Sequence, residues 1–131
     1  MELAFPWPYS QGEWLAWWAA LATVLFGLLM FFAPAASLRI MRLRPADTHP
    51  EAVGEARATM AGFYLGLGLS CLLLAQPMLY LALGLSWAFT AFGRLVSILS
   101  DRGSTVYNWV SLVIELVLAT LPLAFALGFV V

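Results

Sequence analysis

Lysine is absent from this sequence, and histidine and cysteine occur once each, as His49 and Cys71. A single cysteine excludes an internal disulfide and a cysteine-based metal cluster, and a single histidine excludes a two-histidine metal site. Charged residues of all kinds make up only 10% of the 131 residues. The six basic residues, all arginines, form no extended basic face, so we expect no nucleic-acid partner. No cofactor-binding motif occurs, and we expect no cofactor and no metal.

Apolar side chains are what the chain has in abundance, at 63% of its residues. Soluble domains are nearer half apolar and a quarter charged, and a chain this short has too high a surface-to-volume ratio to hide the excess. A hydrocarbon solvent removes that difficulty, so the composition predicts an integral membrane protein. Residues 1–12 contain no positively charged region, and we therefore expect no cleavable signal peptide.

Four apolar segments are long enough to cross a bilayer, which takes roughly 20 residues in a helix. The first ends near Pro34, because proline removes a helix hydrogen bond. No charged residue occurs in 58–92, which is long enough for two spans with a tight turn at Gln76-Pro77. The sequence predicts an all-α, integral membrane four-helix bundle that forms one domain, 1–131. The expected helices are 14–36, 51–75, 78–99 and 106–131.

The arginines predict the orientation of the bundle. With four spans, the connecting segments 37–57 and 100–105 lie on one side of the membrane. All six arginines belong to that side: Arg39, Arg42, Arg44, Arg57, Arg94 and Arg102. The positive-inside rule makes that side cytoplasmic. We expect a multi-pass protein of the cell inner (plasma) membrane, N-out/C-out, with both termini on the extracytoplasmic side.

Three of these arginines alternate with apolar residues just after the first span. Arg39, Arg42 and Arg44 are separated by isoleucine, methionine and leucine. This pattern is typical of a short segment that lies in the membrane interface with its arginines among lipid phosphates. Membrane lipids are therefore expected partners.

Small residues recur at every fourth position of the second predicted helix: Gly54, Ala58, Gly62, Gly66 and Ser70. Such a helix-packing ridge lets another helix backbone approach closely. Packing inside the bundle is the favoured interpretation, and a homodimer face is the alternative.

A polar stripe runs along the fourth predicted helix, where Ser104, Asn108, Ser111 and Glu115 follow at spacings of four, three and four. Lipid offers no hydrogen-bond partners, so the stripe should face the protein interior. Glu115 lies about 15 Å and Arg94 about 10 Å from the turn that joins their helices, at 1.5 Å per residue. An unpartnered charge at that depth is costly, and we predict that Arg94 and Glu115 interact, directly or through water.

Further charged groups approach this pair from the same side of the membrane. Glu55 and Arg57 open the second helix, and Asp101 follows Arg94 by seven residues. We predict a polar chamber that opens to the cytoplasm and is lined by Arg57, Arg94, Glu115, Asp101, Glu55, Asn108 and Ser111. One interpretation is a buried ion-pair network that fixes helix register. The other is a ligand or ion pocket, in which an arginine holds an anionic headgroup or a small carboxylic acid.

Trp87, near mid-membrane, is expected to pack in the core rather than to serve as a ligand platform.

The charged residues also resemble those of a known family. Glu55 and Arg57 open the second helix, Gly93-Arg94 ends the third and is followed by Asp101, and Glu115 lies inside the fourth. The pattern is similar to that of small four-helix bacterial inner-membrane proteins known only as a domain of unknown function, over roughly residues 15–130. The architecture is also distantly similar to DoxX-like membrane proteins. The resemblance implies the fold and the topology, and it implies no reaction.

Three functional hypotheses follow. The leading one is a non-enzymatic membrane protein, a binding or accessory component that works as a homo-oligomer or beside a larger membrane complex. The second is a small, proton-coupled transporter of an anionic or amphiphilic solute, acting as an oligomer. The third is a lipid-modifying membrane enzyme. A sealed Arg94–Glu115 pair favours the first, a cavity that reaches Glu115 favours the second, and an amphiphile bound between the helices favours the third.

Overall fold

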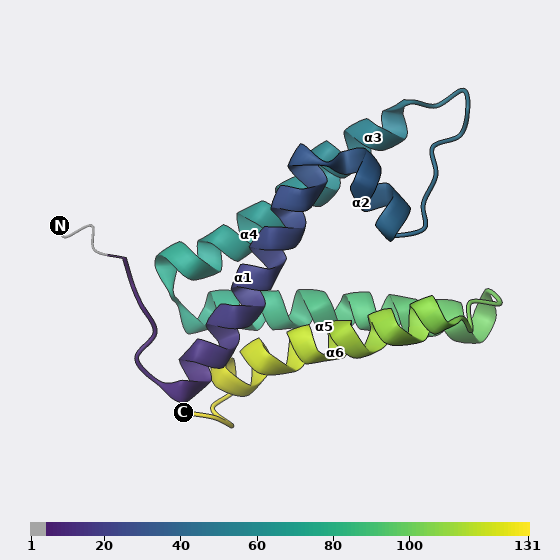
Figure 1. Cartoon of the computed structure of the whole chain (residues 1–131). Helices are drawn as coiled ribbons and strands as arrows, with labels where there is room; N and C mark the ends of the chain where they lie inside the picture. Colours follow the sequence, from purple (N-terminus) through teal and green to yellow (C-terminus); the bar gives the residue numbers. More distant parts are fainter. Residues whose placement is uncertain (1–4) are drawn as a thin grey trace.

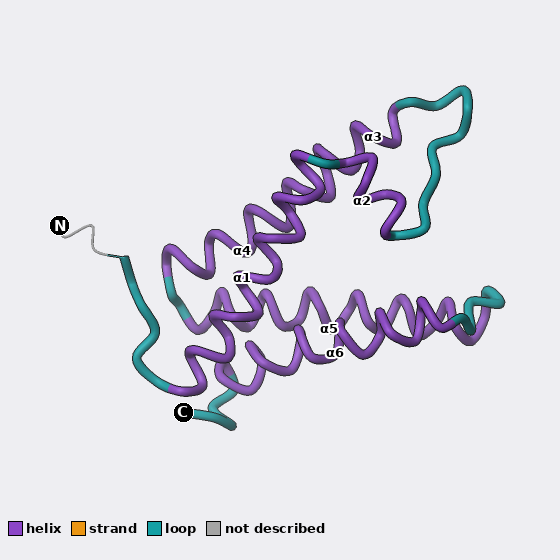
Figure 2. Tube along the Cα trace, in the orientation of Figure 1, coloured by secondary structure: helices purple, strands orange, loops and turns teal. Residues whose placement is uncertain are grey.

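The computed structural model describes residues 5–131, and in that range every regular element is a helix. The elements are α1 (Gln11–Phe32), α2 (Pro34–Ile40), α3 (Glu51–Glu55), the π-helical turn η1 (Ala56–Met60), α4 (Ala61–Leu74), α5 (Pro77–Ser100) and α6 (Val106–Ala126) (Figures 1 and 2). α3, η1 and α4 form one continuous helix, Glu51–Leu74. That helix, α1, α5 and α6 are each long and apolar enough to cross a membrane. The all-α architecture with four apolar spans is therefore confirmed.

The helices begin and end where local chemistry dictates. The hydroxyl of Ser10 accepts a hydrogen bond from the backbone N–H of Glu13 at 3.2 Å and so caps the start of α1. α1 stops at Phe32, and Pro34 opens α2, because a proline at the first position of a helix needs no N–H partner. The expected first span, 14–36, is thus broken before its end. α6 stops at Ala126 rather than at 131.

The four long helices form two pairs. α1 packs along α4, and α5 packs along α6. The pairs meet where α1 also packs against α6, and there the backbone N–H of Gly12 donates to the carbonyl of Val131 at 3.2 Å. Figure 1 shows that the pairs diverge from that end, so that the loop after α2 and the turn after α5 lie far from the start of α1. The fold is therefore two diverging helix pairs rather than four helices in contact along their length.

The hydrophobic core fills the end of the molecule where the pairs meet. Its buried residues are Ala16, Ala19, Ala20, Val24, Cys71, Leu72, Tyr80, Leu83, Trp87, Leu118 and Ala119. Beyond Trp87, a second cluster of Ala91, Ile98 and Leu112 joins only α5 to α6. In the diverging half, the helices thus pack within each pair, and space remains between the two pairs.

Small residues line the contact between α1 and α4 and let the two helices approach closely. These residues are not those of the predicted ridge. A Cβ atom on Gly68 of α4 would lie 2.7 Å from Val24 Cγ2 and 3.1 Å from the carbonyl oxygen of Ala20. In contrast, a Cβ atom on Gly54, Gly62 or Gly66 would meet nothing within 4 Å. The prediction that the ridge Gly54, Ala58, Gly62, Gly66 and Ser70 packs inside the bundle is wrong for the described chain. Most of the small residues at this interface belong to α1, which supplies alanines and a glycine. The face of α4 that packs against them carries both small and large side chains.

Candidate functional site

The charged pair between α5 and α6 has the geometry of a fork. Arg94 Nε donates to Glu115 Oε1 at 2.7 Å, and Arg94 Nη2 donates to Glu115 Oε2 at 2.9 Å. The Glu115 side chain is 8% exposed and that of Arg94 is 26% exposed. Bidentate, charge-assisted hydrogen bonds of this kind are among the strongest that proteins form. The predicted contact between these two residues is confirmed, and it is direct.

Asn108 ties the pair to the turn between α5 and α6. Its Oδ1 accepts from Arg94 Nη1 at 2.8 Å, and its Nδ2 donates to the carbonyl of Gly103 at 2.9 Å. Only one orientation of the amide satisfies both bonds. The turn is tight, since a Cβ on Gly103 would lie 2.8 Å from the carbonyl oxygen of Ser97. Three of the five guanidinium N–H groups of Arg94 are thereby used, and the other two have no acceptor in the described chain.

A cavity of about 460 Å³ lies beside this pair, between the two helix pairs, and we call it the interhairpin cavity. α1 contributes Phe26, Leu29 and Met30 to its wall, and α6 contributes Ile114 and Leu118. Ser111, Arg94 and Glu115 also line it. The lining is predominantly apolar, and its charged side chains are Arg42, Arg94 and Glu115. Trp87 and Leu118, which belong to the core where the helix pairs meet, line its other end. The cavity thus combines an apolar region with a region that carries charged side chains.

Aromatic side chains form the deep part of this cavity. Trp87 lies seven residues before Arg94, which is roughly 10 Å along α5. Its ring stacks on that of Tyr64, with centroids 5.6 Å apart and planes 11° apart. Its Nε1 donates to the hydroxyl of Thr23 at 3.0 Å. The side chain belongs to the core, as expected, and it also lines the cavity.

A second cavity of about 430 Å³, which we call the outer cavity, lies toward the turn between α5 and α6. It shares Met41, Arg42, Arg94 and Tyr107 with the interhairpin cavity. Tyr107 is the one aromatic residue of this shared lining. The Cζ atom of Arg42 is 5.4 Å from the centroid of that ring, and the Cζ atom of Arg94 is 5.9 Å from it. Both distances suit cation–π interactions.

Arg42 reaches Tyr107 through an unusual backbone conformation. The N–H of Leu43 donates to the carbonyl of Leu38 at 2.7 Å, and the N–H of Arg42 donates to the carbonyl of Arg39 at 3.0 Å. These two bonds are a Schellman motif at the end of α2, in which Arg42 takes the left-handed position that glycine usually occupies. Its φ is 59°. A side chain in this conformation costs roughly 1–2 kcal/mol.

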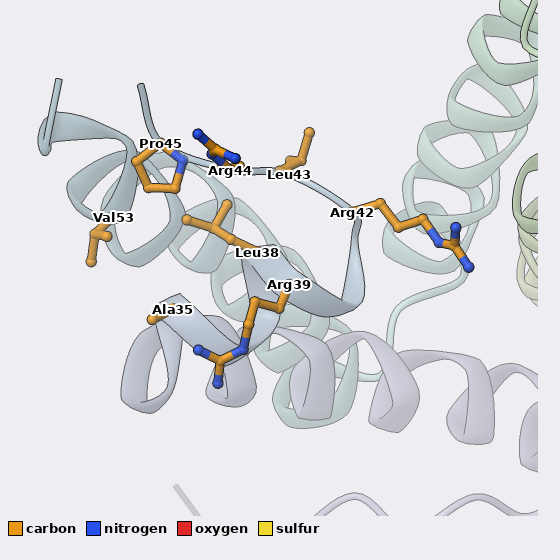
Figure 3. A pocket seen from close by; sticks show the side chains of 8 residues that line it. All are labelled: Ala35, Leu38, Arg39, Arg42, Leu43, Arg44, Pro45 and Val53. Carbon is orange, nitrogen blue, oxygen red and sulfur yellow. The ribbon is translucent and has the colours of Figure 1, made fainter. Parts of the chain in front are cut away.

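Figure 3 shows where this turn sends the three arginines that follow the first span. They line a surface cavity of about 440 Å³ between α2 and α3. Arg39 and Arg44 stay with that surface, whereas the side chain of Arg42 extends away from them toward α5 and α6 (Figure 3). The expected interface arginines are thus divided between two environments.

Three residues of the predicted chamber do not line either cavity at Tyr107. Arg57 Nε donates to the carbonyl of Phe31 at 2.9 Å, where it caps the end of α1. Glu55 accepts from the hydroxyl of Thr59 at 2.9 Å. Asp101 is exposed at the end of α5. Glu55 and Arg57 are absent from the cavities because the helix pairs diverge, which carries α3 and η1 away from α5 and α6. Asp101 is absent because it follows the last residue of α5, beyond the part of that helix that lines the cavities.

Of the residues predicted to line the chamber, Arg94, Glu115, Asn108 and Ser111 lie together at the two cavities. Arg42 is found there, and Arg57 is not. Arg42 was expected to contact lipid phosphates, and Tyr64 and Tyr107 were not expected at the site. No local pattern distinguishes Arg42 from the neighbouring arginines. Tyr107 precedes Asn108 in the helix that carries the polar stripe. That position next to the stripe was the only feature of the sequence that could have indicated Tyr107 as a site residue.

Four apolar helices of membrane-spanning length and an ion pair between two of them define a multi-pass membrane protein. Residues 12–126 match the family described as Domain of unknown function (DUF4345), and the chain belongs to that family. The resemblance to a family of unknown function is thereby confirmed, while the similarity to DoxX-like proteins stays a prediction. No curated protein and no solved structure matches the chain.

Proposed function

We propose that this protein is a non-enzymatic binding component of the membrane that holds an amphiphilic molecule between its two helix pairs. The observation that carries the proposal is the interhairpin cavity, whose lining is predominantly apolar but includes the charged side chains of Arg42, Arg94 and Glu115. Its volume of about 460 Å³ falls within the roughly 300–1,000 Å³ of small-molecule sites. Such a site suits a ligand with an acyl or other apolar chain and a polar head.

The chemistry of the walls supports an amphiphile rather than a wholly polar solute. Phe26, Leu29, Ile114 and Leu118 offer no hydrogen-bonding side-chain group to a polar ligand, and Met30 offers only a weakly accepting thioether sulfur. A buried polar group without a partner costs roughly 1–3 kcal/mol or more. A polar solute would therefore be restricted to the charged end, whereas an apolar chain fills the remaining volume without that cost.

A photoactivatable fatty acid, palmitate with a diazirine in its chain, tests this proposal on the purified full-length protein in neutral detergent. We expect it to label peptides of α1 and α6 that line the interhairpin cavity. Ile114→Trp adds bulk at a lining position and should reduce this labelling by on the order of fivefold or more, because the added ring excludes the chain. Labelling is read by mass spectrometry of the cross-linked peptides.

Val113→Trp is the matched control for this substitution. Val113 is the preceding residue of α6, it is 59% exposed, and it does not line the cavity. The control variant should label like the unsubstituted protein. Equal loss in both variants, or labelling spread evenly over all lipid-facing helices, would contradict a binding cavity.

The arginine-bearing end is proposed to be cytoplasmic, in a plasma membrane, with both chain termini outside. The support is that all six arginines lie in the half of the molecule away from the start of α1 and the end of the chain. In this orientation, Arg39 and Arg44 are placed to contact lipid phosphates of the inner leaflet. The polar end of the cavity then faces the cytoplasmic leaflet.

Single-cysteine variants test this orientation, on a Cys71→Ser background. Tyr9 precedes α1 and is 97% exposed, and Thr48 lies in the exposed loop after α2. In intact cells, a membrane-impermeant maleimide should label Tyr9→Cys, and it should label Thr48→Cys only after the cells are lysed. The reverse pattern would overturn the proposed topology.

A carrier is the second candidate function, and one observation favours it: Glu115 itself lines the interhairpin cavity. Both of its oxygens are held by Arg94, so a solute or proton that engages Glu115 must compete with that arginine. Glu115→Gln should then abolish uptake of an amphiphilic solute by vesicles while the protein still folds.

A further inference from the structure

The two cavities meet at a junction with more positive than negative charge. Arg42 and Arg94 both line the interhairpin cavity and the outer cavity, and both lie against the ring of Tyr107. The structure describes two ion pairs in residues 5–131, His49 with Glu51 and Arg94 with Glu115, and neither includes Arg42. Glu115 balances one of the two guanidinium charges, so the junction carries about one net positive charge.

Two guanidinium groups that share one aromatic ring repel each other, and an anion bound near both would offset that repulsion. Arg94 retains two N–H donors after its bonds to Glu115 and Asn108. Arg42 supplies five more donors, in a planar group that matches the oxygens of a phosphate or a carboxylate. The junction therefore has both the charge and the donors for an anionic group.

The polar end must also provide the selectivity of such a site. Inside a bilayer an apolar chain is surrounded by other apolar chains, so its transfer into an apolar cavity gains little free energy. A charge-assisted hydrogen bond gives much more discrimination than this transfer. The groups at the junction, rather than the apolar walls, are then the ones that decide which amphiphile binds.

We propose that Arg42 and Arg94 together bind the anionic headgroup, a phosphate or a carboxylate, of an amphiphile whose chain occupies the interhairpin cavity. This inference rests on the proposed function and names the class of ligand. The left-handed backbone of Arg42 supports it, because that conformation disfavours any side chain and yet turns this one toward Tyr107. A cationic headgroup is disfavoured, since the ring of Tyr107 that would receive it already carries two arginines.

Competition against the photoactivatable palmitate tests the headgroup directly, on the full chain in neutral detergent. The competitors are hexadecyl phosphate, palmitate, hexadecanol and inorganic phosphate. Hexadecyl phosphate and palmitate should displace the probe at concentrations on the order of tenfold below that of hexadecanol, which has the same chain without a charge. Equal displacement by hexadecanol would overturn the proposal. So would displacement by inorganic phosphate alone at similar concentrations, because the site would then hold a free anion.

Arg42→Gly separates a binding role from a structural one. Glycine suits the left-handed position, so this variant should unfold no more easily than the unsubstituted protein. Its preference for hexadecyl phosphate over hexadecanol should nevertheless fall by on the order of tenfold. An unchanged preference would overturn the role of Arg42.

Arg102→Gly is the matched control, because Arg102 also has a left-handed backbone, with a φ of 56°, just after a long helix (α5), and it lines neither cavity. This variant should keep the headgroup preference intact. A probe that fails to label the cavity at all would overturn the proposed function itself. A probe that labels the cavity without distinguishing the headgroups overturns only the inference about Arg42 and Arg94.

Discussion

Glu115→Leu should destabilise the protein by about 3–5 kcal/mol, which is the loss typical of breaking one side of a buried ion pair. The substitution removes both acceptors of the bidentate contact and leaves the guanidinium of Arg94 with Asn108 as its partner in the described chain. Arg94 is 26% exposed and lies about 9 Å from the end of α5, at 1.5 Å per residue, so part of the loss is recovered if its side chain extends toward the interface.

The double variant, Arg94→Leu with Glu115→Leu, should be more stable than the variant that lacks Glu115 alone. Removing both charges also removes the desolvation penalty, and leucines pack well in an apolar environment. Unfolding by sodium dodecyl sulfate in mixed micelles, followed by helical circular dichroism, gives the four free energies of a double-mutant cycle. Glu55→Leu, which removes an exposed carboxylate outside the pair, is the control and should change stability little.

The cycle also decides between the two interpretations of the pair. If the double variant folds and keeps its preference for hexadecyl phosphate over hexadecanol, the pair serves mainly to hold α5 and α6 in register. If it folds and loses headgroup preference, the pair belongs to the binding site. Single variants with stabilities within about 0.5 kcal/mol of the unsubstituted protein, the range of ordinary surface substitutions, would contradict the buried-pair argument altogether.

The contact between Arg94 and Glu115 was predictable because it is local along the chain. α5 and α6 are joined by a short turn, and the constant rise of a helix places both side chains at a similar depth from that turn. The helix breaks near Pro34 and Gln76 were predictable for a similar reason, since proline acts on its immediate neighbours. Axial positions could therefore be calculated from the sequence alone.

Rotation about the helix axes was not predictable in the same way. Glycine, alanine and leucine occur around the circumference of α4, so no contrast between polar and apolar faces marks the side that packs. The divergence of the helix pairs, which removes Glu55 and Arg57 from the site, depends on contacts between distant segments. The left-handed turn at Arg42 was not predictable either, because glycine is the usual sequence signal for such a turn and this position holds an arginine.

Gly68→Leu should have the next largest effect, a loss of about 1–3 kcal/mol of unfolding free energy or more. The new Cβ atom would lie 2.7 Å from Val24 Cγ2, 3.1 Å from the carbonyl oxygen of Ala20 and 3.1 Å from the backbone nitrogen of Val24. Backbone atoms of α1 cannot rotate away, so the helices must separate. Val24 and Ala20 belong to the core where the two helix pairs meet, and the separation should loosen that end of the molecule.

Gly62→Leu on the same helix is the matched comparison, because a Cβ atom there meets nothing within 4 Å. In a monomer, Gly62→Leu should leave the free energy of unfolding unchanged or raise it by up to about 1 kcal/mol, since glycine is a poor helix former. Both variants are measured by the same unfolding experiment, and equal losses would contradict the assignment of the packing face. The oligomeric state of Gly62→Leu, measured by light scattering, tests the remaining role of the ridge. If that face joins two copies, a bulky side chain should convert the dimer to a monomer, whereas an unchanged mass would exclude this face as a dimer contact.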